Sequence, residues 1–463
     1  MQGTQIKDFT KGPIAKELLI FSLPLFLSNL LQIVYNMVDM IIIGNHLGKN
    51  ALSAVAVGGD VSGLLTFLAI GFSGAGQVII ARLIGAKRQK DIGTFVGTMT
   101  GFLLVAALTI SCLGFVFRHP LLKLMHTPPE AYQGALEYSV VCMMGMVFIY
   151  GYNIVSAILR GMGDSKHPFV FISIAAVLNL LLDILFVMVL EMGPAGAAIA
   201  TVVSQAVSFI ACAIFLLCHK EQFQLNVRLS VFVHWNRSML SDLLKLGFPM
   251  AIKSASVQIS KLFVNSWINS YGIVVSAFAG IANKVGSVSI LVSNAMNTSG
   301  STVVGQNLAA GDFRRVNRTL RALTVINLSV AAVFSGLLLL FPEAIFSIFT
   351  TDPAVLALVP RYIPIAVLLF IGSALRAIMN ALINGSGNHR INFVTAILDG
   401  IVLRIGLSVL FGLVLDMKHF GFWLGDALAG FTPFWIGVVF YLSGHWKKGR
   451  MVPEKETDDV RAE

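Results

Sequence analysis

Long apolar stretches, separated by short polar connections, run along the whole chain. About 20 apolar residues cross a bilayer as a helix, and stretches of that kind begin near Leu18, Ala51, Ile92, Tyr132, Pro168, Pro194, Leu243, Val274, Leu320, Val355, Phe393 and Phe420. None of them alternates apolar and polar residues as a membrane β-strand does. Because backbone in lipid must satisfy its own hydrogen bonds, the pattern predicts an all-α integral membrane protein with twelve transmembrane helices.

This pattern occurs twice. The stretch LRGMGDSK at 159–166 returns as INGSGNHR at 383–390, and the shift is 387 − 163 = 224 residues. One further residue of shift carries Pro24 onto Pro249. Many secondary transporters are built from such repeats and bind substrate and coupling ion near the repeat interface. We therefore expect two pseudo-symmetric lobes of six helices each.

The longest polar connection divides the chain near its middle. It runs from about His219 to Ser241. We predict an N-lobe at 1–218 with helices 1–6, a cytoplasmic inter-lobe linker at 219–241, a C-lobe at 242–446 with helices 7–12, and a cytoplasmic tail at 447–463.

Composition and charge support membrane insertion and predict an orientation. The chain is 56% hydrophobic and only 12% charged, with a net charge of +10. Lys and Arg concentrate in connections on the side of both termini, and the opposite connections hold only Lys49, Arg118, Lys123, Arg361 and Lys418. Basic residues are retained on the cytoplasmic side, so we expect both termini to be cytoplasmic. We also expect a multi-pass protein of the plasma membrane, which in a bacterium is the inner membrane. The basic residues are scattered over many loops, and this argues against nucleic-acid binding.

The chain lacks the motifs of a nucleotide-driven pump or an enzyme. Its one Gly-Lys pair, Gly48-Lys49, lacks the spacing and hydroxyl residue of a phosphate loop, and there is no HExxH or GxSxG. The sequence predicts neither an enzyme nor a resident cofactor, and any active transport must use an ion gradient. The expected partners are a small amphipathic substrate and the lipid bilayer, and we expect a monomer.

Acidic residues inside apolar helices are costly and therefore point to function. At 1.5 Å per residue, Asp39 lies about 35 Å along the first span and Asp183 about 24 Å along the fifth, which are compatible depths. Asn179 precedes Asp183 by one turn, and Thr201 of the sixth span reaches a similar level. These oxygen ligands suit a hard cation, and two close carboxylates also retain a proton. Na⁺ and H⁺ both fit, and a purely structural role in helix packing is the alternative.

Four segments together resemble the MATE (multidrug and toxic compound extrusion) transporters. They are QIVYNMVDMIIIG at 32–44, LNLLLD at 178–183, GAAIAT at 196–201 and VGQNLAAGD at 304–312. The resemblance covers nearly the whole chain. It implies two six-helix lobes around a central cleft, and an antiporter that exports amphipathic organic compounds, often cationic, in exchange for Na⁺ or H⁺.

The resemblance also assigns residues. Those that match the amino-lobe cation site of the DinF-like branch are Asp39, Asn179, Asp183 and Thr201, and those that match its polar neighbours are Tyr138 and Asn153. The depth estimate favours Tyr138 and sets Asn153 further inward. Pro24 matches a first-helix proline proposed to act as a hinge, and a fixed kink is the alternative.

The second half differs from a simple copy. Its register places Leu407 at the position of Asp183 and Val264 at that of Asp39. The ionisable residues of its spans are instead mostly basic, namely Lys253, Lys261, Lys284, Arg376 and Arg404, with Asp399. We predict that Gln258, Lys261 and Lys284 line a polar substrate cavity. The alternative is an internal ion-pair network, for example Arg376 with Asp399.

Three other functions remain open. A flippase for lipid-linked sugars would fit a cationic cavity, although more than twelve spans would be expected. An intramembrane enzyme is the least favoured, and a channel gives no reason for an acid pair in one lobe only.

Overall fold

The computed structural model of the chain describes residues 6–125, 127–225 and 235–448, whose regular structure is helical. The first half contains α1 (Ile14–Gly85), α2 (Gln89–Val116), α3 (Arg118–Leu124), α4 (Pro129–Met144), α5 (Met146–Gly161), α6 (Lys166–Asp183), the π-helical η1 (Ile184–Val189) and α7 (Gly193–Cys218). The second half begins with α8 (Arg237–Asn269), α9 (Ile273–Ala309), α10 (Phe313–Leu340), α11 (Pro342–Ser347), α12 (Pro353–Leu356) and α13 (Val359–Gly385). It ends with α14 (His389–Ile397), η3 (Leu398–Val402), α15 (Leu403–Val409), η4 (Leu410–Val414), α16 (Lys418–Ala429), α17 (Thr432–Leu442) and η5 (His445–Lys448).

These helices form the twelve predicted spans. Nine helices or helix runs of the described chain are long and apolar enough to cross a membrane, and the α4–α5 pair, bent by 51°, is a tenth. One of the nine, α1, contains two spans, because its 72 residues are broken at Gly48, where φ is 79°. The 33-residue α8 is the twelfth span, less apolar because it carries Lys245, Lys253 and Lys261.

Duplication is visible in the backbone as well as in the sequence. Residues with positive φ recur 224 or 225 positions apart, in the pairs Gly48 and Gly272, Lys87 and Gly311, Gly163 and Gly387, Glu191 and Asp416, and Gly193 and Lys418. The π-helical η1 and η4 correspond in the same way. Gly48 therefore breaks α1 where Gly272 separates α8 from α9, so that α1 is the counterpart of those two helices.

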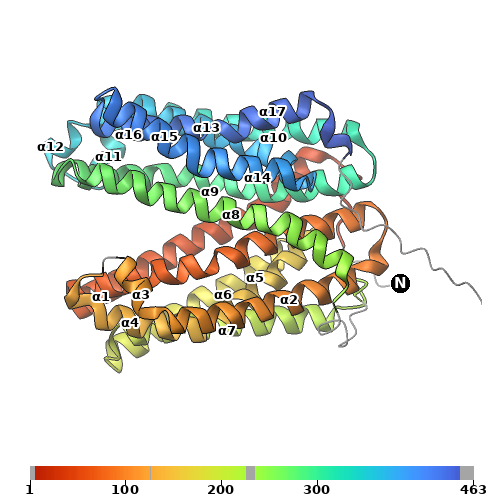
Figure 1. Ribbon diagram of the computed structural model, residues 1–463, viewed down its shortest axis with the longest axis horizontal. Helices are drawn as coiled ribbons and strands as arrows, with labels where there is room; N and C mark the ends of the chain where they lie inside the picture. The colour runs from red at the N-terminus through yellow and green to blue at the C-terminus, as the bar shows by residue number, and fades with distance from the viewer. Residues whose placement is uncertain (1–5, 126, 226–234, 449–463) are drawn as a thin grey trace, which may run out of the picture.

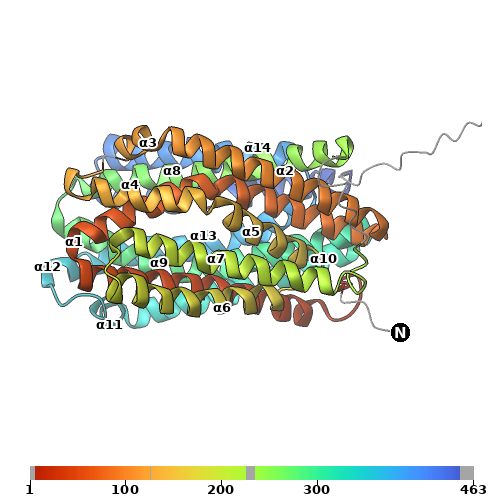
Figure 2. The same cartoon turned by 90° about the horizontal axis from the view of Figure 1, so that it is seen from below.

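The helices lie side by side along the long axis in two layers. In Figure 1 the helices of the first half form the lower layer and α9 to α17 the upper one, with α8 between them, and Figure 2 shows the first half from below. Across the layers α1 packs against α8 and α9. The start of α1 belongs to the upper layer, because Leu18 and Phe21 are buried with residues of α9, α10 and α13.

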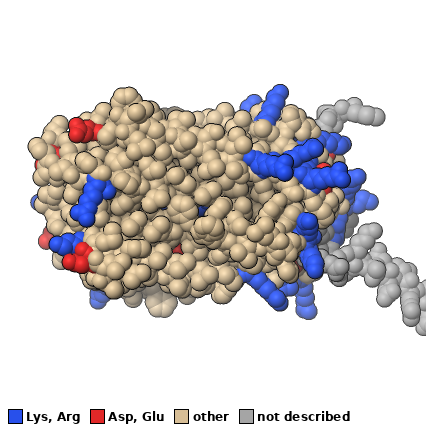
Figure 3. All heavy atoms as spheres, turned by 90° about the horizontal axis from the view of Figure 1, so that it is seen from above, with Lys and Arg blue, Asp and Glu red and all other residues tan. Residues whose placement is uncertain are grey.

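Charged residues mark the two ends of this bundle. Figure 3 shows Lys and Arg gathered at one end, a few charged residues at the other, and a nearly uncharged belt between them. Large apolar side chains that a soluble protein would bury are exposed, among them Leu181, Ile214 and Val333, at 58%, 55% and 60%. This distribution is that of a protein whose belt faces hydrocarbon.

A short N-terminal segment, residues 6–12, ties the two lobes together. Lys7 N donates to Met162 O at 2.9 Å in the N-lobe. In the C-lobe, Phe9 N donates to Gln306 Oε1 at 2.9 Å, and Arg315 Nε donates to Phe9 O at 2.8 Å. The segment therefore crosses the lobe boundary at one end of the molecule.

The structure does not test three sequence predictions: the linker, the tail and the hinge at Pro24. Of the predicted linker 219–241, residues 226–234 lie outside the described residues, as do 449–463 of the predicted tail. At Pro24, α1 is helical without interruption, and Ser28 Oγ donates to Pro24 O at 2.8 Å. A hinge at Pro24 stays a prediction.

Candidate functional site

The two predicted acids of the N-lobe lie next to each other. Asp39 is on the first span of α1, and Asp183 is the last residue of α6, which packs against α1 and continues directly into the π-helical η1. Their carboxyl groups are within hydrogen-bonding reach of each other. Asp183 is 1% exposed and Asp39 is half-buried. Neither forms an ion pair with a Lys or Arg of the described chain, so each acid has the other as its nearest charge.

Asn179 supports this pair from one turn earlier on α6. With its amide nitrogen toward Asp39, Asn179 donates to both carboxylate oxygens of Asp39, at 3.2 Å each. Asp183 Oδ1 is buried and has no hydrogen-bond partner among the described residues. A buried carboxylate oxygen without a donor needs a proton or a cation.

Thr201 and Tyr138 complete the surroundings. Thr201 Oγ1 donates to Ala197 O at 3.0 Å on its own helix, α7, and lies within hydrogen-bonding reach of the Tyr138 side chain. The Tyr138 side chain is 9% exposed and also lies close to both acids. Gly58 of α1 makes room for it, because a Cβ there would lie 2.5 Å from the Tyr138 ring. Four helices, α1, α4, α6 and α7, thus converge at this site.

One predicted member is not brought into this group, and one residue was missed. Asn153 donates to Ile149 O at 2.8 Å within α5. Tyr35, absent from the sequence prediction, lies close to Asp39. Its position one turn before Asp39 on the same face of α1 was the available signal.

The donor set fits both predicted coupling ions. Carboxylate, amide and hydroxyl oxygens are the ligands of a hard cation such as Na⁺. The same pair of carboxylates can share a proton, because two adjacent negative charges in a dry site are unfavourable. The residues that would hold either ion are Asp39, Asp183, Asn179 and Thr201.

A second cluster of ionisable residues lies in the C-lobe. Arg376 Nη2 and Arg404 Nη2 donate to Asp399 Oδ1 at 2.7 and 3.0 Å, and Arg404 Nη1 also pairs with Asp426. Asp399 is fully buried. The ion-pair network considered from the sequence is therefore present. Sequence analysis missed Asp426, whose signal was a lone acid in the apolar twelfth span.

Two lysines of α8 face this network. Lys253 Nζ donates to Asn380 Oδ1 at 2.5 Å, and Lys261 lies near Asp426 and Arg404 without an ion pair to any described acid. The cluster formed by Lys253, Lys261, Arg376, Arg404, Asp399 and Asp426 thus has four basic and two acidic members. Its formal excess is two positive charges, since 4 − 2 = 2.

Among the described residues, no side-chain hydrogen bond or ion pair joins the other predicted cavity residues, Gln258 and Lys284, to that cluster. Gln258 on α8 and Lys284 on α9 are exposed. Neighbouring polar side chains on the same helices do meet, since Asn283 Nδ2 donates to Asn265 Oδ1 at 3.5 Å. Among the described residues, no hydrogen bond or ion pair joins the N-lobe acids to the C-lobe cluster.

Comparison with known proteins identifies this architecture. The MatE family model matches twice, at residues 24–185 and 249–410, so that Pro24 and Pro249 begin equivalent repeats. The chain therefore belongs to the MatE family of multidrug efflux transporters, which are not enzymes. It is a multi-pass membrane protein whose family acts on small molecules.

Individual relatives match along most of their length. The Bacillus subtilis protein named Probable multidrug resistance protein YpnP is 28% identical over 448 residues, 97% of this chain and 99% of that protein. A Shewanella oneidensis protein named FAD transporter is 25% identical over 386 residues, 79% of this chain and 83% of that one. A solved structure described as the outward-facing conformation of a multidrug resistance MATE family transporter superposes with a TM-score of 0.88 at 21% identity, over 98% of this chain and 100% of that one.

Proposed function

We propose that this protein is a secondary antiporter that exports amphipathic organic compounds in exchange for Na⁺ or H⁺. The observation that carries the proposal is the pair of adjacent carboxyl groups of Asp39 and Asp183 within the membrane. Neither acid forms an ion pair with a described Lys or Arg. Such a pair is stable only when a cation or proton reduces its negative charge. Binding and release of that cation would then be linked to the arrangement of α1, α4, α6 and α7.

The coupling follows from differential binding. A cation can drive a conformational change only if it binds one state more tightly than the other. Asp39 is on α1, which packs against both lobes, whereas Asp183 is on α6 of the N-lobe. A shift of α1 against α6 would change the separation of the two carboxyl groups and therefore their affinity for the cation. The cargo would be released to the outside when the cation binds from the outside.

The polarity of the cargo is a separate part of the proposal. The C-lobe cluster has an excess of positive charge, and Arg376 and Asp426 keep 24% and 19% of their side-chain surface exposed. A cationic wall of this kind favours cargo that carries an acidic group on an aromatic or apolar body. The name of the Shewanella oneidensis relative, FAD transporter, is in line with such a cargo. A lipid-linked anionic sugar has the same polarity, and is the alternative.

Orientation and assembly belong to the same proposal. We assign both termini to the cytoplasm, supported by the concentration of Lys and Arg at one end of the molecule in Figure 3. We also propose that a single chain is the transport unit, because the acid pair and the C-lobe cluster are each complete within one chain.

Efflux from proteoliposomes tests the function. Export of a fluorescent amphipathic carboxylate and of a cationic dye would be measured with Na⁺ and proton gradients imposed separately. We expect Asp183→Asn to abolish gradient-driven efflux, because the amide keeps the volume but not the charge. Asp60→Asn is the matched control, since it removes an exposed acid of α1 outside the pair.

The outcomes separate the parts of the proposal. Efflux by Asp183→Asn at the wild-type rate under both gradients would refute the coupling site. An equal loss in Asp60→Asn would make the effect a general one of charge removal. Wild-type efflux of the cationic dye alone would reject the anionic cargo while leaving the antiporter intact. Absence of wild-type efflux with either dye would favour the lipid-linked alternative.

A further inference from the structure

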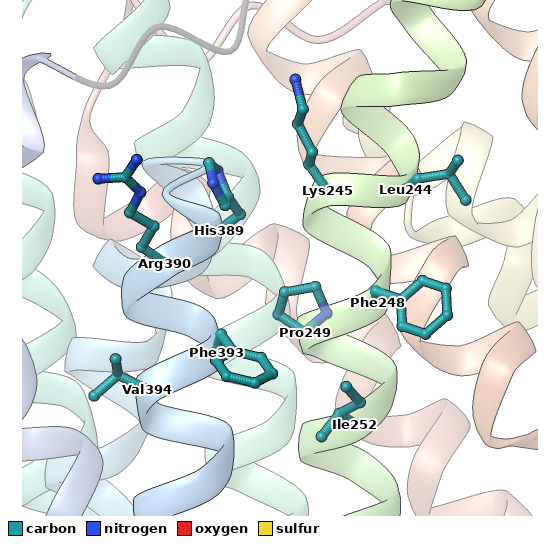
Figure 4. A pocket seen from close by; sticks show the side chains of 9 residues that line it. All are labelled: Leu244, Lys245, Phe248, Pro249, Ile252, His389, Arg390, Phe393 and Val394. Atoms are coloured by element: carbon teal, nitrogen blue, oxygen red, sulfur yellow. The ribbon is translucent and has the colours of Figure 1, made fainter.

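A groove lies between α8 and α14 near the basic end of the bundle, and none of its lining residues belongs to either ionisable cluster. Its volume is about 400 Å³, and it is lined by side chains from both helices. Figure 4 shows Lys245, His389 and Arg390 at one end of the groove and Pro249 and Phe393 further along it, while the Phe248 ring at its edge is turned toward α1, where it packs on Phe72. The groove thus has a basic end and an apolar floor.

Local packing explains why the two helices separate here. At Gly400, just after α14, the helices are in close contact, because a Cβ there would lie 2.5 Å from Ser256 Cβ, and Ser260 Oγ donates to Gly400 O. Toward the basic end, α8 instead packs tightly on α1, where a Cβ on Gly247 would lie 2.3 Å from Phe72. The side of α8 that faces α14 is left open, and Phe393 only partly fills it.

The floor of the groove faces the surroundings of the protein. Phe248 is 54% exposed, Phe393 47% and Val394 43%. These residues are on spans, at the level where the uncharged belt meets the basic end, so hydrocarbon rather than water is the medium that suits them. A water-soluble ligand would leave this apolar surface unmatched.

The rim carries an excess of positive charge. Lys245 and Arg390 both lie close enough to His389 to affect it electrostatically, and both are exposed. Asp242 lies one turn before Lys245 and offsets part of its charge, but it also faces Arg82, so the two cations Lys245 and Arg390 still leave the rim positive. None of the three rim residues forms an ion pair with a described acid. The start of α14 adds its partial positive charge on the same side.

Arg390 belongs to a second groove as well. On the other side of α14, between α14 and α17, a groove of about 550 Å³ is lined by Arg390, Trp435 and Val439. Trp435 is 63% and Val439 68% exposed. Arg390 therefore lies between two apolar grooves, which matches a ligand that has one anionic head and two apolar chains.

We propose that this groove is a binding site for an anionic phospholipid. Lys245 and Arg390 bind the phosphate of the head group, and one acyl chain lies along Pro249 and Phe393. Basic pockets between transmembrane helices recognise anionic head groups in this way. The lipid would occupy the space between α8 and α14. Because α8 packs against α1 and also carries Lys253 of the C-lobe cluster, a bound lipid would affect the contact between the lobes.

Retention of defined lipids by the purified full-length chain tests the site. The protein in detergent would be mixed with equal amounts of dioleoyl phosphatidylglycerol and dioleoyl phosphatidylcholine, and native mass spectrometry would count the lipids retained. Since each basic residue contributes about fivefold to the affinity for an anionic head group, we expect Lys245→Gln/Arg390→Gln to reduce the preference for phosphatidylglycerol by about 25-fold. Each single variant should lose part of it.

The control is Arg314→Gln/Arg318→Gln, which removes the same charge from exposed positions of α10. It should keep the wild-type preference. An unchanged preference in the Lys245 and Arg390 variant, or an equal loss in the control, would overturn the proposal. Displacement of phosphatidylglycerol by millimolar inorganic phosphate would also overturn it, because the site would then recognise phosphate without needing the acyl chains. If the double variant does not purify as a folded protein, the single Lys245→Gln variant gives the same comparison.

Discussion

The substitution Gly85→Ala tests whether the two lobes are held in close contact at the basic end. Gly85 is the last residue of α1, and a Cβ built on it would lie 2.0 Å from the backbone oxygen of Gln306 on α9. An ordinary contact begins near 3.4 Å, so the two helices must separate by about 1.4 Å. The neighbouring atom is backbone and cannot rotate away. The side-chain amide of Gln306 also binds the N-terminal segment.

The expected magnitude follows from overpacking. Forcing an extra methyl group into a packed contact costs roughly 1–3 kcal/mol. If the contact exists only when the lobes are closed at this end, the ratio of open to closed molecules rises by about 5- to 150-fold. Alanine has a higher helix propensity than glycine by about 1 kcal/mol, so a loss of the closed state cannot come from the helix itself.

Double electron–electron resonance measures this change. Spin labels at Lys90 on α2 and Arg314 on α10, both exposed, report the separation of the lobes. Gly63→Ala is the matched control, because no atom lies within 4 Å of a Cβ at that position of α1. Gly85→Ala should increase the population at long distance, and Gly63→Ala should not. Identical distance distributions in the two variants would refute the reasoning.

Two further substitutions test other contacts. Arg315→Ala removes hydrogen bonds to three carbonyl groups of the segment 6–12, each worth about 1.5–3 kcal/mol for a charged donor. Amide hydrogen exchange in that segment should be faster than in the exposed control Arg314→Ala, and equal exchange would contradict the assignment. Asp399→Asn leaves the buried Arg404 with a weaker partner, so we expect thermal unfolding to show a loss of about 3–5 kcal/mol. No loss of stability would mean that the C-lobe cluster is not held together by that carboxylate.

The depth of each residue along its membrane span could be predicted from the sequence, and these depths predicted part of the candidate site. Asp39, Asn179, Asp183 and Thr201 were grouped because the sides on which their spans begin were predicted from Lys and Arg, and a helix rises 1.5 Å per residue. The structure brings Asp39, Asn179 and Asp183 together, and it places Thr201 next to Tyr138, which lies close to both acids. The prediction did not use the position of Tyr35 one turn before Asp39, and it could not give the orientation of the Asn179 amide toward Asp39, because depth does not specify how two helices are rotated toward each other.

For the C-lobe cluster, the sequence showed which charges lie in the membrane but not which of them meet. The sequence analysis recognised five intramembrane charges of this cluster, Lys253, Lys261, Arg376, Asp399 and Arg404. Their grouping required the lateral packing of α8, α13, η3, α15 and α16. Asp426 and Asn380 were missed, although they bind Arg404 and Lys253. Lys284 was predicted to line a cavity with Lys261; it is exposed on α9, and its place in a cavity stays a prediction.

The sequence by itself determined the all-helical class, the twelve spans and the duplication. Each follows from a one-dimensional requirement, because every stretch that crosses the bilayer must be apolar and must satisfy its own backbone. Only the tertiary structure decided which faces meet: the closeness of Asp39 to Asp183, the close contact of Gly85 with Gln306, and the open groove between α8 and α14. These depend on helix rotation and side-chain fit between segments far apart in the chain, and hydropathy carries no information about either.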